Sequence, residues 1–496
     1  MYIIFDTETT GLPKRWDAPI TDTDNWPRCV QIAWQVHDEM GRLIEHEDYL
    51  IKPDGFNIPF DSEKIHGIST ELAQEQGIEL TEVLSKFNNA LSKAKFVVGQ
   101  NIGFDLNIMG AEFHRYQVEN RMTNMVVLDT CTEVTAGLLK LPGGRGGRFK
   151  LPNLTELHSY LFGVPFSEAH NATADVEATT RCFFELIRKE VFRPEELQVD
   201  TGYFVEFKQV NADIIQPVGL RHVNLKAASD ALRIKSSPEV DKVKIDDETI
   251  TALKKAQFAH LHNHTQFSVL QSTISIDSLV KAAAKENMAA VAMTDHGNMM
   301  GAFHFVSKVL NHNKDLEENK KQALAKGETF EGEPIKPIVG CEFFVCEDRT
   351  DKTRKDNGYQ VVFLAKNKQG YHNLAKMASV AYTEGFYYVP RIDKSTVEKY
   401  KENLIVLSGN LNGEVPSKVL NIGEAQAEEA LLWWKNLFGD DFYLEIMRHG
   451  QEEEDRVNQT LIEFGNRHQV KLIATNNTYY VNRADAHAHD ILLCVK

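Results

Sequence analysis

Short apolar runs alternate with helix-like segments in the first part of the chain, residues 1–190. The runs YIIF, CVQIAWQV and KFVVG predict strands. The segments LTEVLSKFNNALSK and TADVEATTRCFFELIRKE carry apolar residues at helical spacing. Because strands and helices take turns along the sequence, this part of the chain is expected to form an α/β domain.

A second alternation of apolar runs and helix-like segments covers residues 256–496. Seven apolar runs separated by helix-like stretches predict strands: FAHLH, AAVAMTD, PIVGCEFFV, YQVVFLA, LIVLSG, FYLEIM and KLIATN. This succession favours a parallel barrel or a barrel-like sheet. Polar residues lie at or just past the ends of these runs, where α/β barrels bind their ligands. They are His262, His264, Asp295, His296, Glu342, Asn410, His449 and Asn477.

Residues 191–255 show neither of these alternating patterns. The segment SSPEVDKVKIDDETITALKK within them is charged and poor in aromatic residues, which is typical of a linker or a loosely packed bridge. The sequence therefore predicts a domain at 1–190, a linker at 191–255 and a second domain at 256–496.

Composition narrows the classes of protein that the chain can belong to. A formal net charge of −16 argues against a globally basic surface for nucleic acid, so any such contact must be local and assisted by metal ions. No apolar run reaches membrane-spanning length, and a strand-like run starts at Tyr2, so we expect a cytoplasmic protein without a signal peptide. The six scattered cysteines fit neither a disulfide framework nor a CxxC zinc site.

Four carboxylates in the first domain suggest a metal site. Asp6 and Glu8 are two residues apart on a predicted strand, so their side chains share one face while Thr7 points away. Asp105 in NIGFDLNIM and Asp175 in HNATADVEAT would complete the group. Like charges so close together raise each other's pKa unless divalent cations keep them ionised. The pattern thus implies two Mg²⁺ or Mn²⁺ ions, about 3.5–4 Å apart in two-metal nucleases.

His170 lies five residues before Asp175, within reach of the same site. A neutral imidazole there can take a proton from an attacking water. Taken singly, each of these residues also has an ordinary structural explanation. Asp6 could lie at an exposed strand end, Asp105 could be a favourable charge at a helix N-terminus, and His170 could be an ordinary surface residue.

Together, these three motifs resemble the DEDDh family of 3′-to-5′ exonucleases, which includes the proofreading epsilon subunit of bacterial DNA polymerase III. The resemblance implies a ribonuclease H-like fold in which Asp6, Glu8, Asp105 and Asp175 bind two metal ions and His170 is the general base. It also implies contacts to the terminal nucleotide from Thr9, Leu12, His66 and Asn101.

The segment PKRWDAPITDTDNWPR, between the first two predicted strands, is longer than the usual turn of that family. Its residues Trp16 and Trp26 could stack on an unpaired base. The alternative, that they pack the insertion onto its own domain, is somewhat favoured, and the sequence leaves both open.

The second domain carries a series of histidines and carboxylates in HLHNHTQFS, TDHGN and GCE, suited to Zn²⁺ or Mn²⁺. These motifs resemble the PHP (polymerase and histidinol phosphatase) domain that opens the alpha subunit of bacterial DNA polymerase III, which implies a distorted (β/α)7 barrel. His262, His264, His296 and Glu342 match metal positions of that family. Other metal positions hold weak ligands instead: Gln271, Gln360, Asn410, Asn477 and Tyr479.

Amides and a phenol supply little charge to hold a transition metal, so we expect at most one residual Zn²⁺ or Mn²⁺ ion and a structural role for this domain. In the alpha-subunit family the sequence after HDILLC continues into the polymerase, whereas this sequence stops at Lys496. We therefore expect the N-terminal part of a larger fusion, or a natural short relative.

The expected function is a proofreading 3′-to-5′ DNA exonuclease that releases nucleoside monophosphates. Its expected partners are a primer 3′ end, a polymerase core in cis or in trans, and replisome subunits such as a sliding clamp. Three alternatives remain open: a 3′-to-5′ exoribonuclease, an active PHP phosphoesterase, and a non-catalytic replicase scaffold.

Overall fold

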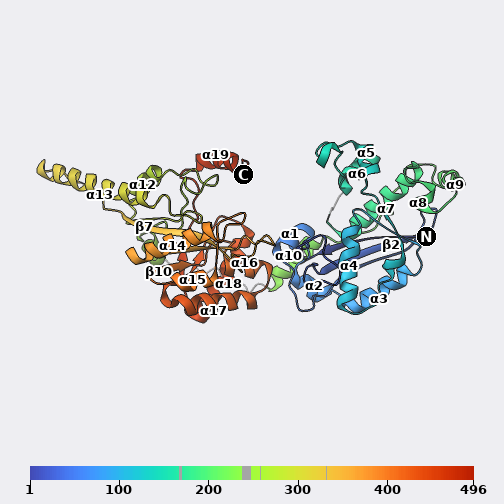
Figure 1. Ribbon diagram of the computed structural model, residues 1–496, viewed down its shortest axis with the longest axis horizontal. Coiled ribbons are helices and arrows are strands. Elements are labelled where there is room, and N and C mark those ends of the chain that lie inside the picture. Colours follow the sequence, from blue (N-terminus) through green and yellow to red (C-terminus); the bar gives the residue numbers. More distant parts are fainter. Residues whose placement is uncertain (167–169, 237–246, 257, 331, 496) are drawn as a thin grey trace. The chain divides into compact units, whose positions relative to one another are not determined.

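The computed structural model describes residues 1–166, 170–236, 247–256, 258–330 and 332–495. The chain divides into two compact units, Met1–Asp241 and Lys242–Lys496 (Figure 1). Among the described residues, no helix combines the length and the apolar character needed to span a membrane.

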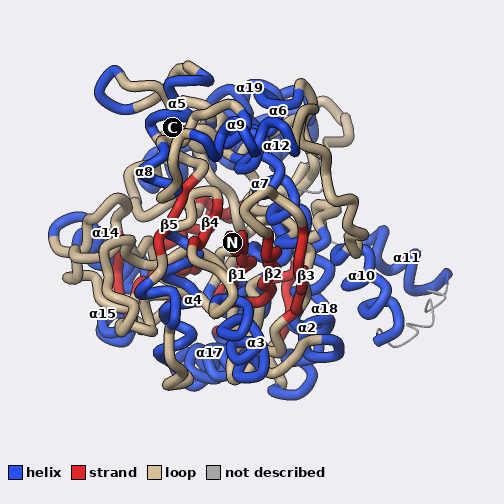
Figure 2. Tube along the Cα trace, turned by 90° about the vertical axis from the view of Figure 1, so that its right-hand side faces the viewer, coloured by secondary structure: helices blue, strands red, loops and turns tan. Residues whose placement is uncertain are grey.

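A five-stranded sheet in the order β3-β2-β1-β4-β5 forms the centre of the first unit (Figure 2). Its strands are β1 (Tyr2–Thr9), β2 (Cys29–His37), β3 (Leu43–Leu50), β4 (Phe96–Gly99) and β5 (Val126–Asp129). Strands β1, β4 and β5 run parallel, whereas β2 is antiparallel to both β1 and β3. The carboxyl ends of the three parallel strands therefore meet at one edge of the sheet.

Helices cover both faces of this sheet. They are α1 (Phe60–His66), α2 (Thr70–Gln76), α3 (Leu80–Leu91), α4 (Gly103–Arg115), α5 (Glu133–Leu139), α6 (Leu154–Phe162), α7 (Ala172–Arg188), α8 (Pro194–Leu197), α9 (Gly202–Val210) and α10 (Leu225–Ser236). Alternate residues of β1 serve the two faces. Ile3 and Phe5 pack into the core with α3 and α4, and Tyr2 and Ile4 pack into the core with α7.

The region expected to be a linker is in part a packed element of the first unit. Leu197, Tyr203, Phe204 and Phe207 belong to the same core as α7, and Leu225 of α10 lies in a core with Ile68 and Leu72. The expectation of a loose bridge is therefore wrong for α8 to α10. The charged run that prompted it starts at Ser236, so it gives no information about the apolar residues before it; residues 237–246 of that run lie outside the described residues.

The second unit is built on a curled sheet in the order β12-β11-β10-β8-β7-β6, with β9 paired to β7. Its strands are β6 (Ala290–Met293), β7 (Lys336–Cys346), β8 (Tyr359–Ala365), β9 (Arg391–Asp393), β10 (Leu404–Leu407), β11 (Phe442–Ile446) and β12 (Lys471–Ala474). The barrel-like α/β fold class is confirmed, but β8 is antiparallel to both β7 and β10. The connection from β7 to β8 contains no helix, so it can be a simple reversal rather than a crossover.

The second unit also contains helices, most of which pack against this sheet or against one another. They are α11 (Asp247–Lys255), α12 (Ile276–Lys285), α13 (Ala302–Ala325), α14 (Lys368–Thr383), α15 (Lys394–Tyr400), α16 (Glu414–Asn421), α17 (Glu424–Phe438), α18 (Glu452–His468) and α19 (Ala486–Leu493).

The apolar run FAHLH does not form a strand in its described residues. It lies beside β6 all the same, because Ala292 N–H donates to the His260 carbonyl over 2.9 Å. The pairing continues where the Thr294 amide donates to the Asn263 carbonyl over 2.8 Å, and the side chain of Asn263 also bonds to the carbonyls of His260 and Ala292.

Candidate functional site

Three elements of the first unit bring the predicted carboxylates together. Asp6 and Glu8 lie near the end of β1, Asp105 lies in the first turn of α4, and Asp175 lies in the first turn of α7. Each of the other three carboxylates raises the pKa of Asp6, which shows that all four lie within electrostatic reach of one another. The structure thus gathers the predicted set at the edge of the sheet where the parallel strands end.

Thr7 fixes one member of this cluster, a role that the sequence analysis missed. Its side chain faces away from Asp6 and Glu8, as expected, but on that side it meets Asp105. The Thr7 hydroxyl donates to Asp105 Oδ1 over 2.6 Å, and the Thr7 amide donates to the same oxygen over 3.0 Å. Asp105 is thereby fixed against β1. The only hint of this role in the sequence was the position of Thr7 between two predicted metal ligands.

The cluster is costly to keep ionised. Burial, followed by the charges of the neighbouring carboxylates, raises the pKa values of Asp6 and Glu8 well above their usual range. Burial also raises the pKa of Asp105 and that of Asp175 to about 7, although hydrogen bonds from Thr7 and from the His170 amide oppose the shift. Among the described residues, no ion pair joins any of these carboxylates to a lysine or an arginine. The donor set is therefore anionic, all-oxygen and unneutralised by the protein, which fits Mg²⁺ or Mn²⁺.

Magnesium is expected to stabilise the first unit more at about pH 8 than at about pH 5. Because folding raises their pKa values, these carboxylates bind protons more tightly in the folded state, and the resulting stabilisation is lost as the pH rises through about 7. A bound divalent cation replaces the protons, and at 100 times its Kd it adds about 2.7 kcal/mol. Thermal unfolding in EDTA and in Mg²⁺ at both pH values measures the effect.

The matched control for this experiment is Asp175→Asn, which removes one charge from the cluster and should flatten both the pH dependence and the response to Mg²⁺. An equal magnesium effect at both pH values in the wild type would contradict the electrostatic account.

His170 lies beside two of the carboxylates. Candidate ligand atoms of Glu8, His170 and Asp175 all lie within 4.8 Å of one another. The backbone of His170 has a φ of 70°, and its amide donates to Asp175 Oδ2 over 3.0 Å. The side chain is exposed and can therefore meet solvent water as well as the cluster.

The four residues predicted to contact a terminal nucleotide lie around this cluster. Thr9 is buried and its hydroxyl donates to the Gly11 carbonyl over 2.7 Å, whereas Leu12 is 74% exposed on the loop that follows β1. Asn101 follows β4, where Asp129 Oδ1 accepts its amide over 2.8 Å. These contacts to a nucleotide remain predictions.

His66 completes that group from the end of α1. It is buried, and burial lowers its pKa to about 4, so the ring is neutral at physiological pH. Its Nδ1 accepts the Ile68 amide over 3.0 Å, which places the ring proton on Nε2. The charge of His170 contributes to the lowered pKa, so the two rings are close enough to interact.

The segment leading into α10 forms a wall beside these two histidines. A cavity of about 180 Å³ is lined by both histidines together with Val223, Asn224 and Lys226. Asn171, which caps α7, donates to the Val223 carbonyl over 3.3 Å. Part of the predicted linker therefore belongs to the candidate site.

Further along, α10 is bonded to the turn that follows His66. Ser229 Oγ donates to the Gly67 carbonyl over 2.7 Å and accepts the Ser69 amide over 3.0 Å. Gly67 has a φ of 78°, and a Cβ there would lie 2.7 Å from the Lys226 amide nitrogen, so the close approach of α10 requires glycine. No short-range sequence signal marks these contacts, because they join residues about 160 positions apart.

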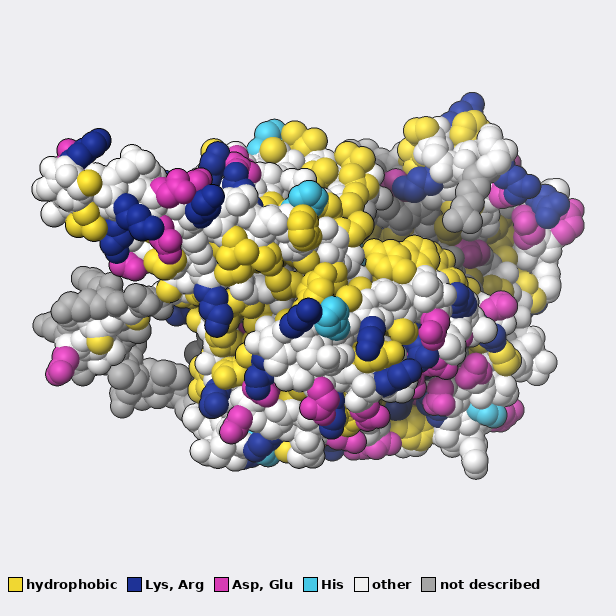
Figure 3. Space-filling view, turned by 60° about the vertical axis from the view of Figure 1, so that its left-hand side comes forward, with side chains coloured by type: hydrophobic (Ala, Val, Ile, Leu, Met, Phe, Trp, Pro, Cys, Tyr) yellow, Lys and Arg dark blue, Asp and Glu magenta, His cyan; other side chains and the backbone are white. Residues whose placement is uncertain are grey.

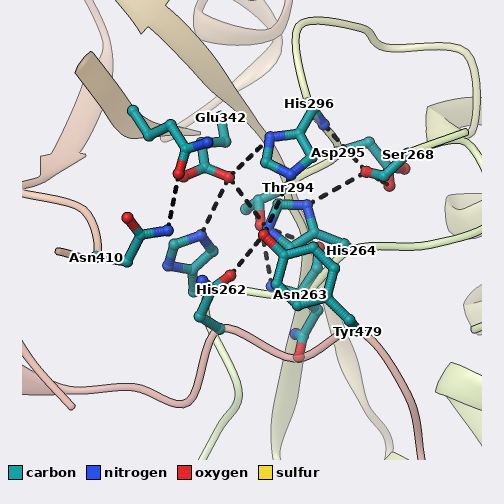
Figure 4. Close-up of polar contacts among 12 residues, drawn as sticks. His262, Asn263, His264, Ser268, Thr294, Asp295, His296, Glu342, Asn410 and Tyr479 are labelled. Atoms are coloured by element: carbon teal, nitrogen blue, oxygen red, sulfur yellow. Dashed lines mark hydrogen bonds and ion pairs between the residues drawn. The ribbon is translucent and has the colours of Figure 1, made fainter. Parts of the chain in front are cut away.

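In the second unit, three predicted histidines surround Glu342 (Figure 4). Glu342 Oε2 lies 3.5 Å from His262 Nε2, 3.1 Å from His264 Nε2 and 3.1 Å from His296 Nδ1. All four side chains are buried. The structure thus brings the whole predicted set together, with candidate ligand atoms of His262, His264 and Glu342 within 4.8 Å of one another.

Glu445 is a further buried carboxylate at this centre, and the sequence analysis missed it. Its Oε1 lies 2.7 Å from His262 Nδ1, so His262 sits between two carboxylates. Burial alone would lower the pKa of His262, but Glu445 and Glu342 outweigh it and raise that pKa to about 10. Burial would likewise raise the pKa of Glu342, yet His296 and His262 hold it well below its usual range. The hint in the sequence was that Glu445 is a charged residue inside the otherwise apolar run FYLEIM.

Of the five weak ligands foreseen from the sequence, Asn477 and Tyr479 contact histidines of this centre, and Asn410 pairs with Gln360. Asn477 Oδ1 lies 3.0 Å from His264 Nε2, and the Tyr479 hydroxyl lies 3.2 Å from His296 Nε2. Asn410 donates to Gln360 Oε1 over 2.9 Å. The donor set fits a single Zn²⁺ or Mn²⁺ ion held by imidazoles and one carboxylate, provided that His262 gives up its proton.

Comparison with known proteins assigns both units. Residues 3–183 match the family model described as exonuclease, and residues 260–449 match the model of the PHP domain. DNA polymerase III subunit alpha of Borreliella burgdorferi is 39% identical over 245 residues, which cover 49% of this chain and 20% of that protein. The Thermus aquaticus subunit is 40% identical over 253 residues, which cover 49% of this chain and 19% of that protein. The chain thus spans about a fifth of the length of these relatives.

Among solved structures, Escherichia coli Exonuclease I in complex with a dA16 oligonucleotide matches 40% of this chain and 42% of its own, with 21% identity and a TM-score of 0.32. The sequence-based expectation of an exonuclease followed by a PHP domain is confirmed by the two family matches. The chain joins an N-terminal exonuclease domain to a PHP domain that is similar to the one in bacterial DNA polymerase III alpha subunits.

Proposed function

We propose that the first unit is a metal-dependent 3′-to-5′ exodeoxyribonuclease that edits primer ends for a replicase of the DNA polymerase III alpha type. The observation that carries this proposal is the buried cluster of Asp6, Glu8, Asp105 and Asp175 beside His170, inside a region that matches the exonuclease family. The DNA polymerase III alpha relatives of the second unit support the replicative setting.

The four carboxylates would hold two divalent cations, which supply charge to activate a water and to stabilise the leaving oxygen. His170 takes a proton from that water at a ring nitrogen. The water oxygen forms a bond to the terminal phosphorus, and the bond from phosphorus to the 3′ oxygen of the preceding nucleotide breaks. That oxygen gains a proton, so the products are a nucleoside 5′-monophosphate and a strand shortened by one residue.

Binding of DNA would be local rather than spread over a basic surface. The chain has a formal net charge of −16, and on the face drawn in Figure 3 the basic side chains are interspersed with acidic ones. A short contact with the 3′ end suits an enzyme that receives the strand from a polymerase core, either in the same chain or in another subunit. Tethering would raise the effective concentration of the editing site near the primer end.

The second unit has a structural role in this proposal. Amides and a phenol face the centre where the PHP family commonly has charged or imidazole ligands, and Glu342 is already bonded to three histidines. A residual Zn²⁺ or Mn²⁺ ion would then stabilise the domain without taking part in hydrolysis.

Digestion of matched single-stranded DNA and RNA oligonucleotides tests the proposal. With a 5′ label and Mg²⁺, the full chain is expected to give a ladder that shortens from the 3′ end of DNA, with release of nucleoside monophosphates. An Asn410→Ala variant, altered only in the second centre, should give the same ladder at the same rate. Faster digestion of RNA would replace the proposal with an exoribonuclease, and a rate that falls in Asn410→Ala would assign hydrolysis to the PHP domain.

A further inference from the structure

The insertion between β1 and β2 is a fixed part of the first unit. The Asn25 side chain accepts the Arg15 amide over 2.7 Å and donates to the Arg15 carbonyl over 2.9 Å. Trp26 is only 3% exposed, and its indole N–H donates to the Pro19 carbonyl over 3.1 Å. A Cβ on Gly110 of α4 would lie 3.2 Å from Ile20, so glycine allows the loop to pack closely on that helix. Trp26 therefore packs the insertion onto its own domain.

Trp16, on the same insertion, has a different environment. It is 60% exposed, and its ring centroid lies 5.8 Å from that of Phe104 at an interplanar angle of 49°. Phe104 directly precedes Asp105 in the first turn of α4, so the indole packs on the turn that carries one carboxylate of the cluster. Several hydrogen bonds hold the backbone of this loop, yet one of its two tryptophan rings is left in solvent.

Two basic residues precede this exposed ring. Lys14 and Arg15 are both exposed, and Arg15 Nε lies 3.8 Å from Asp17 Oδ1. In a chain with a net charge of −16, adjacent cations next to an exposed tryptophan at the edge of a nuclease site form a local surface for a nucleic acid strand. An aromatic face accepts any base, and the cations suit the phosphates on either side of it.

We infer that Trp16, supported by Phe104 and flanked by Lys14 and Arg15, stacks on an unpaired base of the DNA strand whose 3′ end enters the carboxylate cluster. This inference rests on the proposed function and adds to it a site for a single-stranded base. Stacking requires the base to leave its duplex partner. The site therefore favours frayed or mismatched ends over paired ones.

The test compares two substrates of the full chain in Mg²⁺. One is a single-stranded oligothymidylate, and the other is the p-nitrophenyl ester of thymidine 5′-phosphate, which has no second base. Trp16→Ala is expected to raise KM for the oligonucleotide by about 5- to 160-fold, the range that corresponds to the loss of one base stack, with little change in kcat. Its kinetics on the ester should not change, and Trp16→Phe should recover most of the affinity.

Tyr160→Ala is the matched control, since Tyr160 is also an exposed aromatic residue of the first unit and should be neutral on both substrates. An unchanged KM for the oligonucleotide in Trp16→Ala overturns the inference. So does an equal loss on both substrates, which would mean that Trp16 only shapes the site.

Binding can be followed without catalysis by titrating the oligonucleotide in Ca²⁺ and recording tryptophan fluorescence. Quenching is expected in the wild type and should be absent in Trp16→Phe. If the wild type hydrolyses neither substrate, the proposed function fails. The base site fails if the oligonucleotide does not quench the fluorescence of the wild type, or if it quenches Trp16→Phe to the same extent.

Discussion

Replacing Asp6 with Asn is expected to lower the rate of 3′-to-5′ DNA degradation by at least about 10³-fold. The substitution keeps the shape of the side chain but removes a charge from a cluster of four carboxylates whose pKa values are all raised. Metal-assisted stabilisation of the transition state contributes several kcal/mol, and each 1.36 kcal/mol corresponds to about a tenfold change in rate. Initial rates on a 5′-labelled oligonucleotide at saturating Mg²⁺ measure the loss.

Two controls separate this effect from unfolding. Asp24→Asn changes an exposed aspartate of the same unit and should leave the rate unaltered. In EDTA at about pH 8, Asp6→Asn should be at least as stable as the wild type, because it relieves repulsion among buried carboxylates. Retention of more than a tenth of the wild-type rate would exclude Asp6 as a metal ligand.

Much of this cluster is readable from short-range patterns. The two-residue spacing of Asp6 and Glu8 on a strand places both on one face, and the structure keeps that arrangement. Asn171 accepts the amides of Thr173 and Ala174 and so begins α7, which puts Asp175 in the first turn. Sequence alone could not show that Thr7 fixes Asp105 from the opposite face, because that contact needs the position of α4.

Long-range packing accounts for most of what the sequence did not predict. The wall made by α10 depends on Ser229 meeting Gly67 and Ser69, residues too far away in sequence to leave a periodic signal. The antiparallel placement of β8 is likewise a property of the whole sheet, since a run such as YQVVFLA fits either direction.

The second centre has a polar core although several of its predicted metal positions hold weak ligands. Among the weak ligands foreseen from the sequence, Asn477 and Tyr479 contact His264 and His296, whereas Asn410 bonds to Gln360. What the sequence analysis did not foresee is that Glu445 and Glu342 flank His262 and form a buried ion-pair network with it. The ion pairs offset the cost of burying these charges, so the fold of this unit depends on all of the members being present.

Replacing Glu342 with Gln is therefore expected to destabilise the second unit by about 3–5 kcal/mol, the usual cost of removing one partner from a buried ion pair. The substitution leaves His262, whose pKa is raised to about 10, with a single carboxylate partner. It also replaces the anionic acceptor shared by His264 and His296 with a neutral amide. Hydrogen exchange followed by mass spectrometry resolves the effect by segment. Peptides from β7 and β11 should exchange roughly 100-fold faster or more.

Glu347→Gln is the matched control, because Glu347 belongs to the same unit but has a side chain that is 75% exposed and is paired with Arg354 on the surface. That variant should exchange like the wild type, since exposed ion pairs contribute little to stability. In both variants, peptides from β1 and β4 should keep their protection, because those strands belong to the core of the other unit. Unchanged exchange at β7 and β11 in Glu342→Gln would mean that Glu342 is held by a bound ion or by solvent rather than by the three histidines, and that the centre still functions as a metal site.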